Sequence, residues 1–125
     1  MAQQRILVVD DDPGIRRTLQ IALSQAGYQV IEAQDGRGAM RLWRDQGADL
    51  VITDIQMPDK NGLEVIIEIR VLSPSTPIVV MTDGGRSKQI GLSEENAKLL
   101  GAIWAVAKPF RLAEMLAVVD QELRA

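Results

Sequence analysis

The chain has 125 residues with 14 basic and 17 acidic side chains, a net charge of −3, and neither cysteine nor histidine. The length suits one domain with its own core. The missing residue types exclude a disulfide framework, a Cys/His zinc site, a thiol nucleophile and a Ser-His-Asp triad. The acidic balance argues against direct nucleic-acid binding. Since no apolar run approaches the roughly 18 residues of a membrane span, we expect a cytoplasmic protein without membrane attachment.

Short apolar runs recur along the chain, each about the length of a buried strand and bounded by turn-forming or charged residues. They are rich in β-branched side chains, which favour strands. We predict five strands, at Ile6–Val9, Tyr28–Ile31, Leu50–Thr53, Ile78–Met81 and Ile103–Val106.

The segments between these runs have helical periodicity. Asp12, directly before Pro13, is predicted to cap the first helix, and Gly27 to close it. Ser93 with its following acidic residues predicts the start of a helix through Leu100, ended by Gly101. Apolar stripes mark the helices: Ile15, Leu19, Ala22, Leu23 and Ala26; Ala39, Met40 and Trp43; Leu63, Ile66 and Ile67; and Leu112, Met115, Leu116, Val119 and Leu123.

Strands that alternate with helices predict an α/β fold with a parallel sheet covered on both faces. Five such units favour the flavodoxin-like (βα)5 architecture with strand order 2-1-3-4-5 over a barrel, which needs eight units. No linker, repeat or low-complexity tract interrupts residues 1–125, so we expect a single domain.

In such sheets, ligands bind beyond the carboxyl ends of the strands, where the strand order reverses. Asp10 and Asp11 follow the first strand and Asp54 follows the third, its predicted neighbour. Thr82 ends the fourth strand and Lys108 follows the fifth. Taken singly, each aspartate has the alternative of a helix cap, Thr82 of a strand-end hydroxyl, and Lys108 of a surface lysine. Four strand ends with complementary groups favour one shared site.

Three clustered carboxylates repel one another unless a cation neutralises them. Oxygen ligands without His or Cys suit a hard ion such as Mg²⁺, which keeps coordination positions for a phosphate. A lysine and a threonine hydroxyl are donors for phosphoryl oxygens, and an aspartate can accept a phosphoryl group. The pattern therefore indicates phosphoryl transfer to a carboxylate.

These motifs together resemble the receiver domains of two-component response regulators, over essentially the whole chain. The resemblance is carried by Val8-Val9-Asp10-Asp11, Thr53-Asp54-Ile55-Gln56-Met57-Pro58 with Asn61-Gly62, Val80-Met81-Thr82 and Lys108-Pro109-Phe110. It implies that Asp54 is the phosphoacceptor, and that Asp10, Asp11, Asp54 and the backbone carbonyl of Gln56 bind Mg²⁺ or Mn²⁺. It also implies that Thr82 and Lys108 contact the phosphoryl oxygens, and that the Lys108–Pro109 bond is cis.

The resemblance further implies a function and partners. The function is a phosphorylation-controlled signalling switch rather than an enzyme, and the donor is the phosphohistidine of a sensor histidine kinase or a phosphotransfer protein. The output is a downstream effector or a homodimer formed through the fourth helix, fifth strand and fifth helix.

Three positions depart from the family pattern. Ala105 stands where an aromatic switch residue is usual, and strand alternation turns the neighbouring Trp104 to the opposite face. Asp83 replaces the usual small residue after the threonine, with two interpretations: an effect on phosphoryl chemistry, or simple exposure to solvent. The stretch from Thr82 to Lys108 is a few residues longer than usual, with the excess assigned to Asp83-Gly84-Gly85-Arg86-Ser87-Lys88, either as a longer turn or as a gating or partner-contacting loop.

The residues also allow two other functions. Asp10 and Asp12 form a DxD pattern, as in small phosphatases or phosphotransferases with an aspartate nucleophile. A degenerate receiver that acts only as a phosphorylation-independent scaffold is the other, and Ala105 is the residue that favours it.

Overall fold

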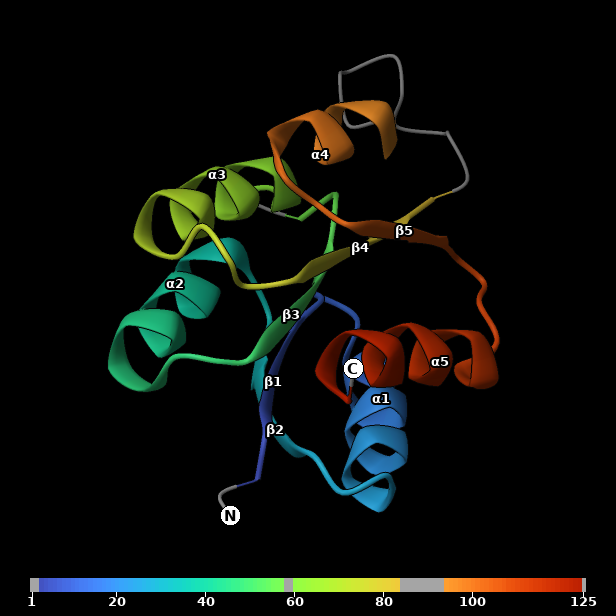
Figure 1. The fold of residues 1–125 in the computed structure, drawn as a ribbon. Helices are drawn as coiled ribbons and strands as arrows, with labels where there is room; N and C mark the ends of the chain where they lie inside the picture. Colours follow the sequence, from blue (N-terminus) through green and yellow to red (C-terminus); the bar gives the residue numbers. More distant parts are fainter. Residues whose placement is uncertain (1–2, 58–59, 84–93, 125) are drawn as a thin grey trace.

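The computed structural model describes residues 3–57, 60–83 and 94–124. These residues form a five-stranded parallel sheet in the order β2-β1-β3-β4-β5 with helices on both faces, as predicted (Figure 1). The strands are β1 (Arg5–Val9), β2 (Gln29–Ala33), β3 (Leu50–Asp54), β4 (Ile78–Thr82) and β5 (Trp104–Ala107). The helices are α1 (Pro13–Gln25), α2 (Gly36–Gln46), α3 (Gly62–Leu72), α4 (Glu94–Leu100) and α5 (Leu112–Leu123).

The five predicted strands are present, and their ends agree with the prediction within two residues. Every residue of β3 and β4 is buried, because these strands lie inside the sheet and are covered on both faces. β2 forms an edge of the sheet and exposes Gln29 and Glu32. Burial on both faces explains why the inner strands appear in the sequence as continuous apolar runs.

The core has two layers, one on each face of the sheet. Figure 1 shows α2, α3 and α4 on one face of the sheet and α1 and α5 on the other. Leu7 and Val9 of β1 pack in the first layer, whereas Ile6 and Val8 pack in the second. This alternation follows from the two-residue period of a strand. No helix in the described part of the chain has both the length and the apolarity needed to cross a bilayer.

Local sequence signals set several helix ends. The carboxylate of Asp12 accepts hydrogen bonds from the backbone of Gly14 and Ile15, so its predicted role as the cap of α1 is confirmed. The C-cap of α1 is Ala26, and Gly27 follows with φ of +100°, a conformation that favours glycine. The predicted cap Ser93 lies outside the described residues.

The end of α5 is anchored to the start of β2. The hydroxyl of Tyr28 donates to Asp120, and Arg124 donates to that hydroxyl and to the backbone carbonyl of Ala26. Burial, together with the hydrogen bond to Asp120, raises the pKa of Tyr28. These contacts hold α5 against the sheet, and thereby the segment that joins α5 to β5.

Candidate functional site

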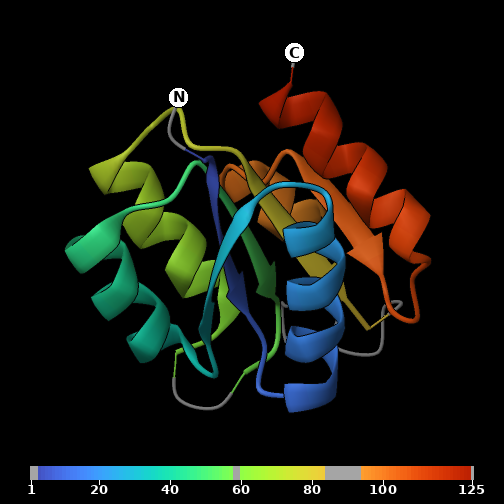
Figure 2. The same ribbon diagram turned by 90° about the horizontal axis from the view of Figure 1, so that it is seen from below.

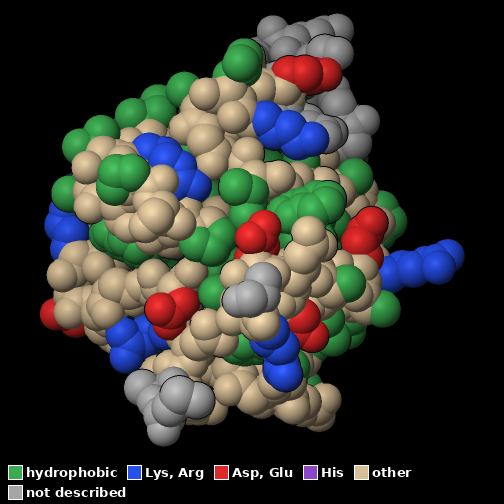
Figure 3. Space-filling view, viewed as in Figure 1, with side chains coloured by type: hydrophobic (Ala, Val, Ile, Leu, Met, Phe, Trp, Pro, Cys, Tyr) green, Lys and Arg blue, Asp and Glu red, His purple; other side chains and the backbone are tan. Residues whose placement is uncertain are grey.

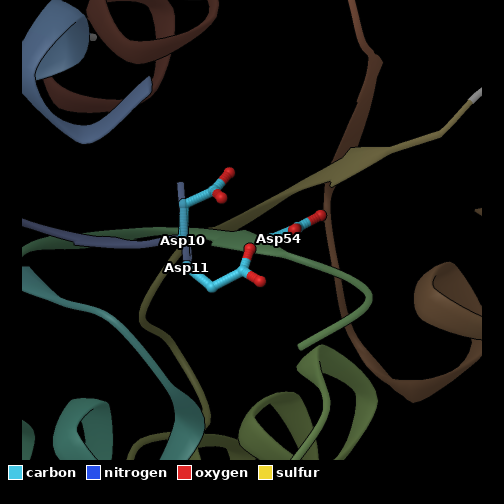
Figure 4. Close-up of side chains that lie close together, drawn as sticks. All are labelled: Asp10, Asp11 and Asp54. Atoms are coloured by element: carbon cyan, nitrogen blue, oxygen red, sulfur yellow. The ribbon is translucent and has the colours of Figure 1, made fainter. Parts of the chain in front are cut away.

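The carboxyl ends of the parallel strands meet along one edge of the sheet (Figure 2). β1 pairs with β3 in a register that aligns Val9 with Thr53, so Asp10 and Asp54 follow on neighbouring strands. The carboxylates of Asp10, Asp11 and Asp54 project to the same side, and ligand oxygens of all three lie within 4.8 Å of one another (Figure 4). The predicted cluster of these aspartates is therefore confirmed.

Asp10 is fully buried and held from several directions. Its backbone N–H donates to the Ala33 carbonyl at 3.1 Å, and its Oδ1 accepts from the backbone N–H of Asp12 at 2.9 Å. Its Oδ2 forms an ion pair with Lys108 Nζ at 2.7 Å, but accepts no hydrogen bond of normal geometry from the described residues. This buried oxygen therefore retains capacity to bind a cation.

Lys108 reaches the acidic cluster from the opposite side of the edge. Its backbone N–H donates to the Thr82 carbonyl at 2.8 Å, which extends the β4–β5 pairing beyond Ala107. The Lys108–Pro109 bond is cis, as the family resemblance implied. The ammonium lies 2.7 Å from Asp10 and 3.3 Å from Asp54, so it bridges two of the three aspartates.

Burial acts in opposite directions on the pKa values of Asp54 and Lys108. Burial raises the pKa of Asp54 to about 6, with a further contribution from the charge of Asp10, while Lys108 and a backbone hydrogen bond from Gln56 oppose the rise. Burial alone would lower the pKa of Lys108, but its close contact with the carboxylate of Asp10 and the charge of Asp54 outweigh burial and raise that pKa. The cluster is thus short of positive charge.

The donor set fits a hard divalent cation. Three carboxylates and one ammonium leave two negative charges uncompensated when all are ionised, a charge that one Mg²⁺ or Mn²⁺ would balance. The buried, incompletely bonded Asp10 Oδ2 and the exposed carboxylate of Asp11 offer oxygen ligands from two directions. All candidate side-chain ligands are oxygen atoms, which such ions prefer.

Thr82 and Gln56 flank the cluster. Thr82 is buried at the end of β4, one residue beyond Met81, which pairs with Asp54. Among the described residues, its hydroxyl makes no hydrogen bond to the three carboxylates. The backbone of Gln56 hydrogen-bonds the Asp54 carboxylate, while the residue itself is exposed. The sequence predicted the backbone carbonyl of Gln56 as a metal ligand, but it did not predict the hydrogen bond from the backbone N–H of Gln56 to the Asp54 carboxylate.

The positions that depart from the family pattern lie on β5 and directly after β4. Ala105 is half-buried against the core layer of α2, α3 and α4, and Trp104 is 37% exposed. Asp83 is half-buried directly after β4. The rest of the predicted long segment, Gly84 to Lys88, lies outside the described residues.

Sequence reasoning missed two residues that contact the backbone of the aspartates. Gly62 packs so closely that a β-carbon there would collide with the Asp54 carbonyl and lie 2.7 Å from Ile55 Cα. Arg16 donates to the backbone carbonyl of Asp10 at 2.7 Å. The turn signal Asn61-Gly62 located the glycine without revealing this contact, and no local signal distinguishes Arg16 from its neighbour Arg17.

A cleft of about 520 Å³ adjoins Lys108. The start of α1 forms one wall, and the segment from Lys108 to the start of α5 forms the other. Ile15, Pro109, Phe110 and Leu112 make the lining largely apolar. The cleft therefore lies directly beside the charged site.

A comparison with protein families matches residues 6–120 to the response regulator receiver domain. The chain is 42% identical over 121 residues to the response regulator MprA of Mycolicibacterium vanbaalenii, covering 96% of this chain and 50% of that protein. It is 32% identical to sporulation initiation phosphotransferase F of Bacillus subtilis, covering 98% of this chain and 96% of that protein. The chain thus spans half the length of the first relative and nearly all of the second.

The fold also matches solved structures. One is the response regulator TrrA of Thermotoga maritima in complex with Mg²⁺ and BeF, with a TM-score of 0.83 and 34% sequence identity. The match covers 97% of this chain and the whole of that one.

Proposed function

Because the chain belongs to the response regulator receiver domain family, a family of phosphorylation-controlled signalling switches, we propose that Asp54 is its phosphoacceptor. We also propose that residues 1–125 act as one such domain. The observation that carries the proposal is the cluster of Asp10, Asp11 and Asp54 with Lys108 bridging two of them. The donor is the phosphohistidine of a histidine kinase or a phosphotransfer protein.

In the proposed reaction, an oxygen of the ionised Asp54 carboxylate attacks the phosphorus. The bond between phosphorus and the donor's imidazole nitrogen breaks, and that nitrogen keeps the electron pair and takes up a proton. With a pKa of about 6, Asp54 is mostly ionised at neutral pH and able to attack. The product is an acyl phosphate on Asp54.

The remaining residues stabilise charge during transfer. Asp10, Asp11, Asp54 and the Gln56 carbonyl would hold Mg²⁺, which supplies charge neutralisation and polarises the phosphoryl oxygens when bound. Lys108 moves from its carboxylate partners to an oxygen of the phosphoryl group. Thr82, at the end of the adjacent strand, donates its hydroxyl to another oxygen. The TrrA structure, a complex with Mg²⁺ and BeF, supports this arrangement by similarity.

The donor protein is proposed to dock at the cleft beside Lys108. Its lining of Ile15, Phe110 and Leu112 accepts apolar side chains, while Asp12 and Lys108 border it with charges. A donor seated there has its phosphohistidine next to the carboxyl edge of the sheet. In this placement the apolar lining of the cleft recognises the donor protein, while the charged cluster of aspartates and Lys108 carries out the phosphoryl transfer.

The output surface is proposed to be the face of α4, β5 and α5, through binding of an effector or a second copy. Exposed hydrophobic side chains gather over α3, α4 and β5 in Figure 3. Those of α4, β5 and the adjoining turn are Leu99, Leu100, Ile103 and Trp104. With Ala105 at the usual aromatic position, signalling through this face does not use an aromatic side chain there. The cytoplasmic location expected from the sequence stays a prediction.

One observation weighs against the small-phosphatase alternative. The Asp12 carboxylate, the second acid of the DxD pattern, caps α1 through the backbone of Gly14 and Ile15. A carboxylate committed to two backbone N–H groups is poorly placed to act as an acid or base on a leaving group. The scaffold alternative is opposed by the intact set of Asp54, Thr82 and Lys108.

The test is treatment with a small acyl phosphate and Mg²⁺, followed by intact-mass and peptide mass analysis. The wild type is expected to gain one phosphoryl group on Asp54, and Asp54→Asn to gain none. Asp49→Asn, on the opposite edge of the sheet, serves as a control that still becomes labelled. Labelling of Asp10 with turnover of a phosphate ester would favour the enzyme, and an unmodified wild type would favour the scaffold.

A further inference from the structure

Arg16 occupies an unusual place for a cation. It lies near the amino end of α1, where the helix dipole disfavours positive charge. Its side chain is nevertheless only 18% exposed, with Nη1 donating to the Asp10 carbonyl at 2.7 Å and Nε lying 3.5 Å from Oε1 of Glu32. The residue thus connects α1, the edge strand β2 and the end of β1.

The atom that Arg16 contacts lies in the backbone between two acidic residues, Asp10 and Asp11. The carbonyl of Asp10 belongs to the peptide group that joins Asp10 to Asp11. Because a peptide group is planar, a hydrogen bond to this oxygen restrains the rotation of the whole unit. The orientation of that unit sets the directions in which both carboxylates leave the backbone.

We propose that Arg16 is a positioning residue for the divalent-cation site, with Glu32 orienting its guanidinium. The proposal rests on the proposed function in that Asp10 and Asp11 bind the metal. Arg16 touches neither the cation nor the phosphoryl group, and acts through the Asp10–Asp11 peptide. Its role corresponds to that of an outer-shell partner, which keeps ligands in a geometry ready for the metal.

A positioning role and a purely electrostatic role predict opposite results. If Arg16 acted only through its charge, removing the charge would strengthen the binding of a divalent cation nearby. If Arg16 holds the peptide, removing it weakens binding, because the ligands must be ordered when the metal binds. The sign of the change therefore distinguishes the two roles.

The experiment measures Mg²⁺ affinity by calorimetry and by amide shifts of residues 10–12, without any phosphoryl donor. Arg16→Gln is compared with Arg17→Gln, which removes the same charge from the adjacent, exposed position. We expect Arg16→Gln to bind Mg²⁺ about tenfold more weakly than Arg17→Gln. Arg16→Lys, which keeps a cationic donor, is expected to recover part of that loss.

Equal or tighter binding by Arg16→Gln would overturn the proposal while leaving the metal site of the wild type intact. A wild type that binds no Mg²⁺ would instead overturn the metal site of the proposed function and this inference with it. If Arg16→Gln does not fold, Arg16→Lys is compared with the wild type instead, since this variant keeps the positive charge and loses the guanidinium that Glu32 orients. A severalfold loss of Mg²⁺ affinity in Arg16→Lys supports the positioning role, and an unchanged affinity refutes it.

Discussion

Lys108 Nζ lies 2.7 Å from the buried Oδ2 of Asp10, an oxygen that has no hydrogen bond of normal geometry from the described residues. The lysine follows the last strand and the aspartate follows the first, so this contact closes the site across the sheet edge. Lys108 therefore supplies a cation at this oxygen. Binding of Mg²⁺ to the same carboxylates would release the lysine for a phosphoryl oxygen.

Replacing Lys108 with methionine therefore leaves the buried Asp10 carboxylate without its cation. Lys108→Met is expected to lower the free energy of unfolding by about 2 kcal/mol without Mg²⁺, because an unpaired buried charge is costly. Saturating Mg²⁺ should restore part of this loss. Chemical denaturation with and without Mg²⁺ measures both effects. A loss no greater than that of Arg17→Met, at an exposed cation of α1, would contradict this explanation.

The raised pKa of Asp54 predicts a pH dependence of stability in the metal-free protein. Between its unfolded pKa near 3.8 and its folded pKa of about 6, the native state binds a proton that the unfolded state has released. The contribution of Asp54 to the free energy of unfolding is therefore fully present below its unfolded pKa and is lost as the pH rises through its folded pKa. The loss is on the order of 2 to 3 kcal/mol.

Denaturation curves of wild type and Asp54→Asn from pH 4 to pH 8 provide the measurement. The variant lacks the titrating group, so we expect it to be the more stable protein at pH 7, with the difference shrinking toward pH 4. Mg²⁺ should reduce the difference at pH 7, since it stabilises the ionised Asp54. A difference that does not vary with pH would show that Asp54 is not destabilised by burial.

Gly62 leaves no room for a side chain against the backbone of Asp54. Gly62→Ala would force the Asp54 carbonyl and Ile55 to move, at an expected cost of about 1 to 3 kcal/mol in unfolding free energy. Because the displaced backbone carries Asp54, the rate of acyl-phosphate labelling should also fall several-fold. Gly38→Ala in α2 is the control, because its nearest contact is a side-chain oxygen at 3.2 Å. Similar labelling rates in both variants would remove Gly62 from the positioning of Asp54.

Asp83 adds a carboxylate at the end of β4, beside Thr82. We expect Asp83→Ala to accelerate labelling by a small anionic acyl phosphate about threefold, because the variant repels the donor less. Asp83→Asn, which keeps the shape and removes the charge, should show the same acceleration. Rates are measured by quenching the reaction at a series of times at low ionic strength and determining the labelled fraction by intact-mass analysis. Equal rates in the wild type and both variants would assign Asp83 no part in phosphorylation.

Most of the fold could be predicted because its signals are local. The apolar runs ending at Val9 and Thr53 are continuous since both strands are buried on two faces, and Asp12 before Pro13 marks a helix start. The rule for parallel sheets then predicted that Asp10 and Asp54 share an edge. The end of β2 was predicted two residues early because an edge strand mixes polar and apolar side chains.

The sequence by itself determined the order of the elements and the set of residues at the strand ends, because periodicity and turn chemistry act over a few residues. The rule for doubly wound parallel sheets then supplied the strand order. The tertiary structure alone decided how these residues interact. The bond from Arg16 to Asp10, the close approach of Gly62 to Asp54 and the raised pKa of Asp54 depend on packing between segments distant in the chain. Burial strengthens such polar contacts, and no pattern within one segment specifies which residue of a distant segment it will contact.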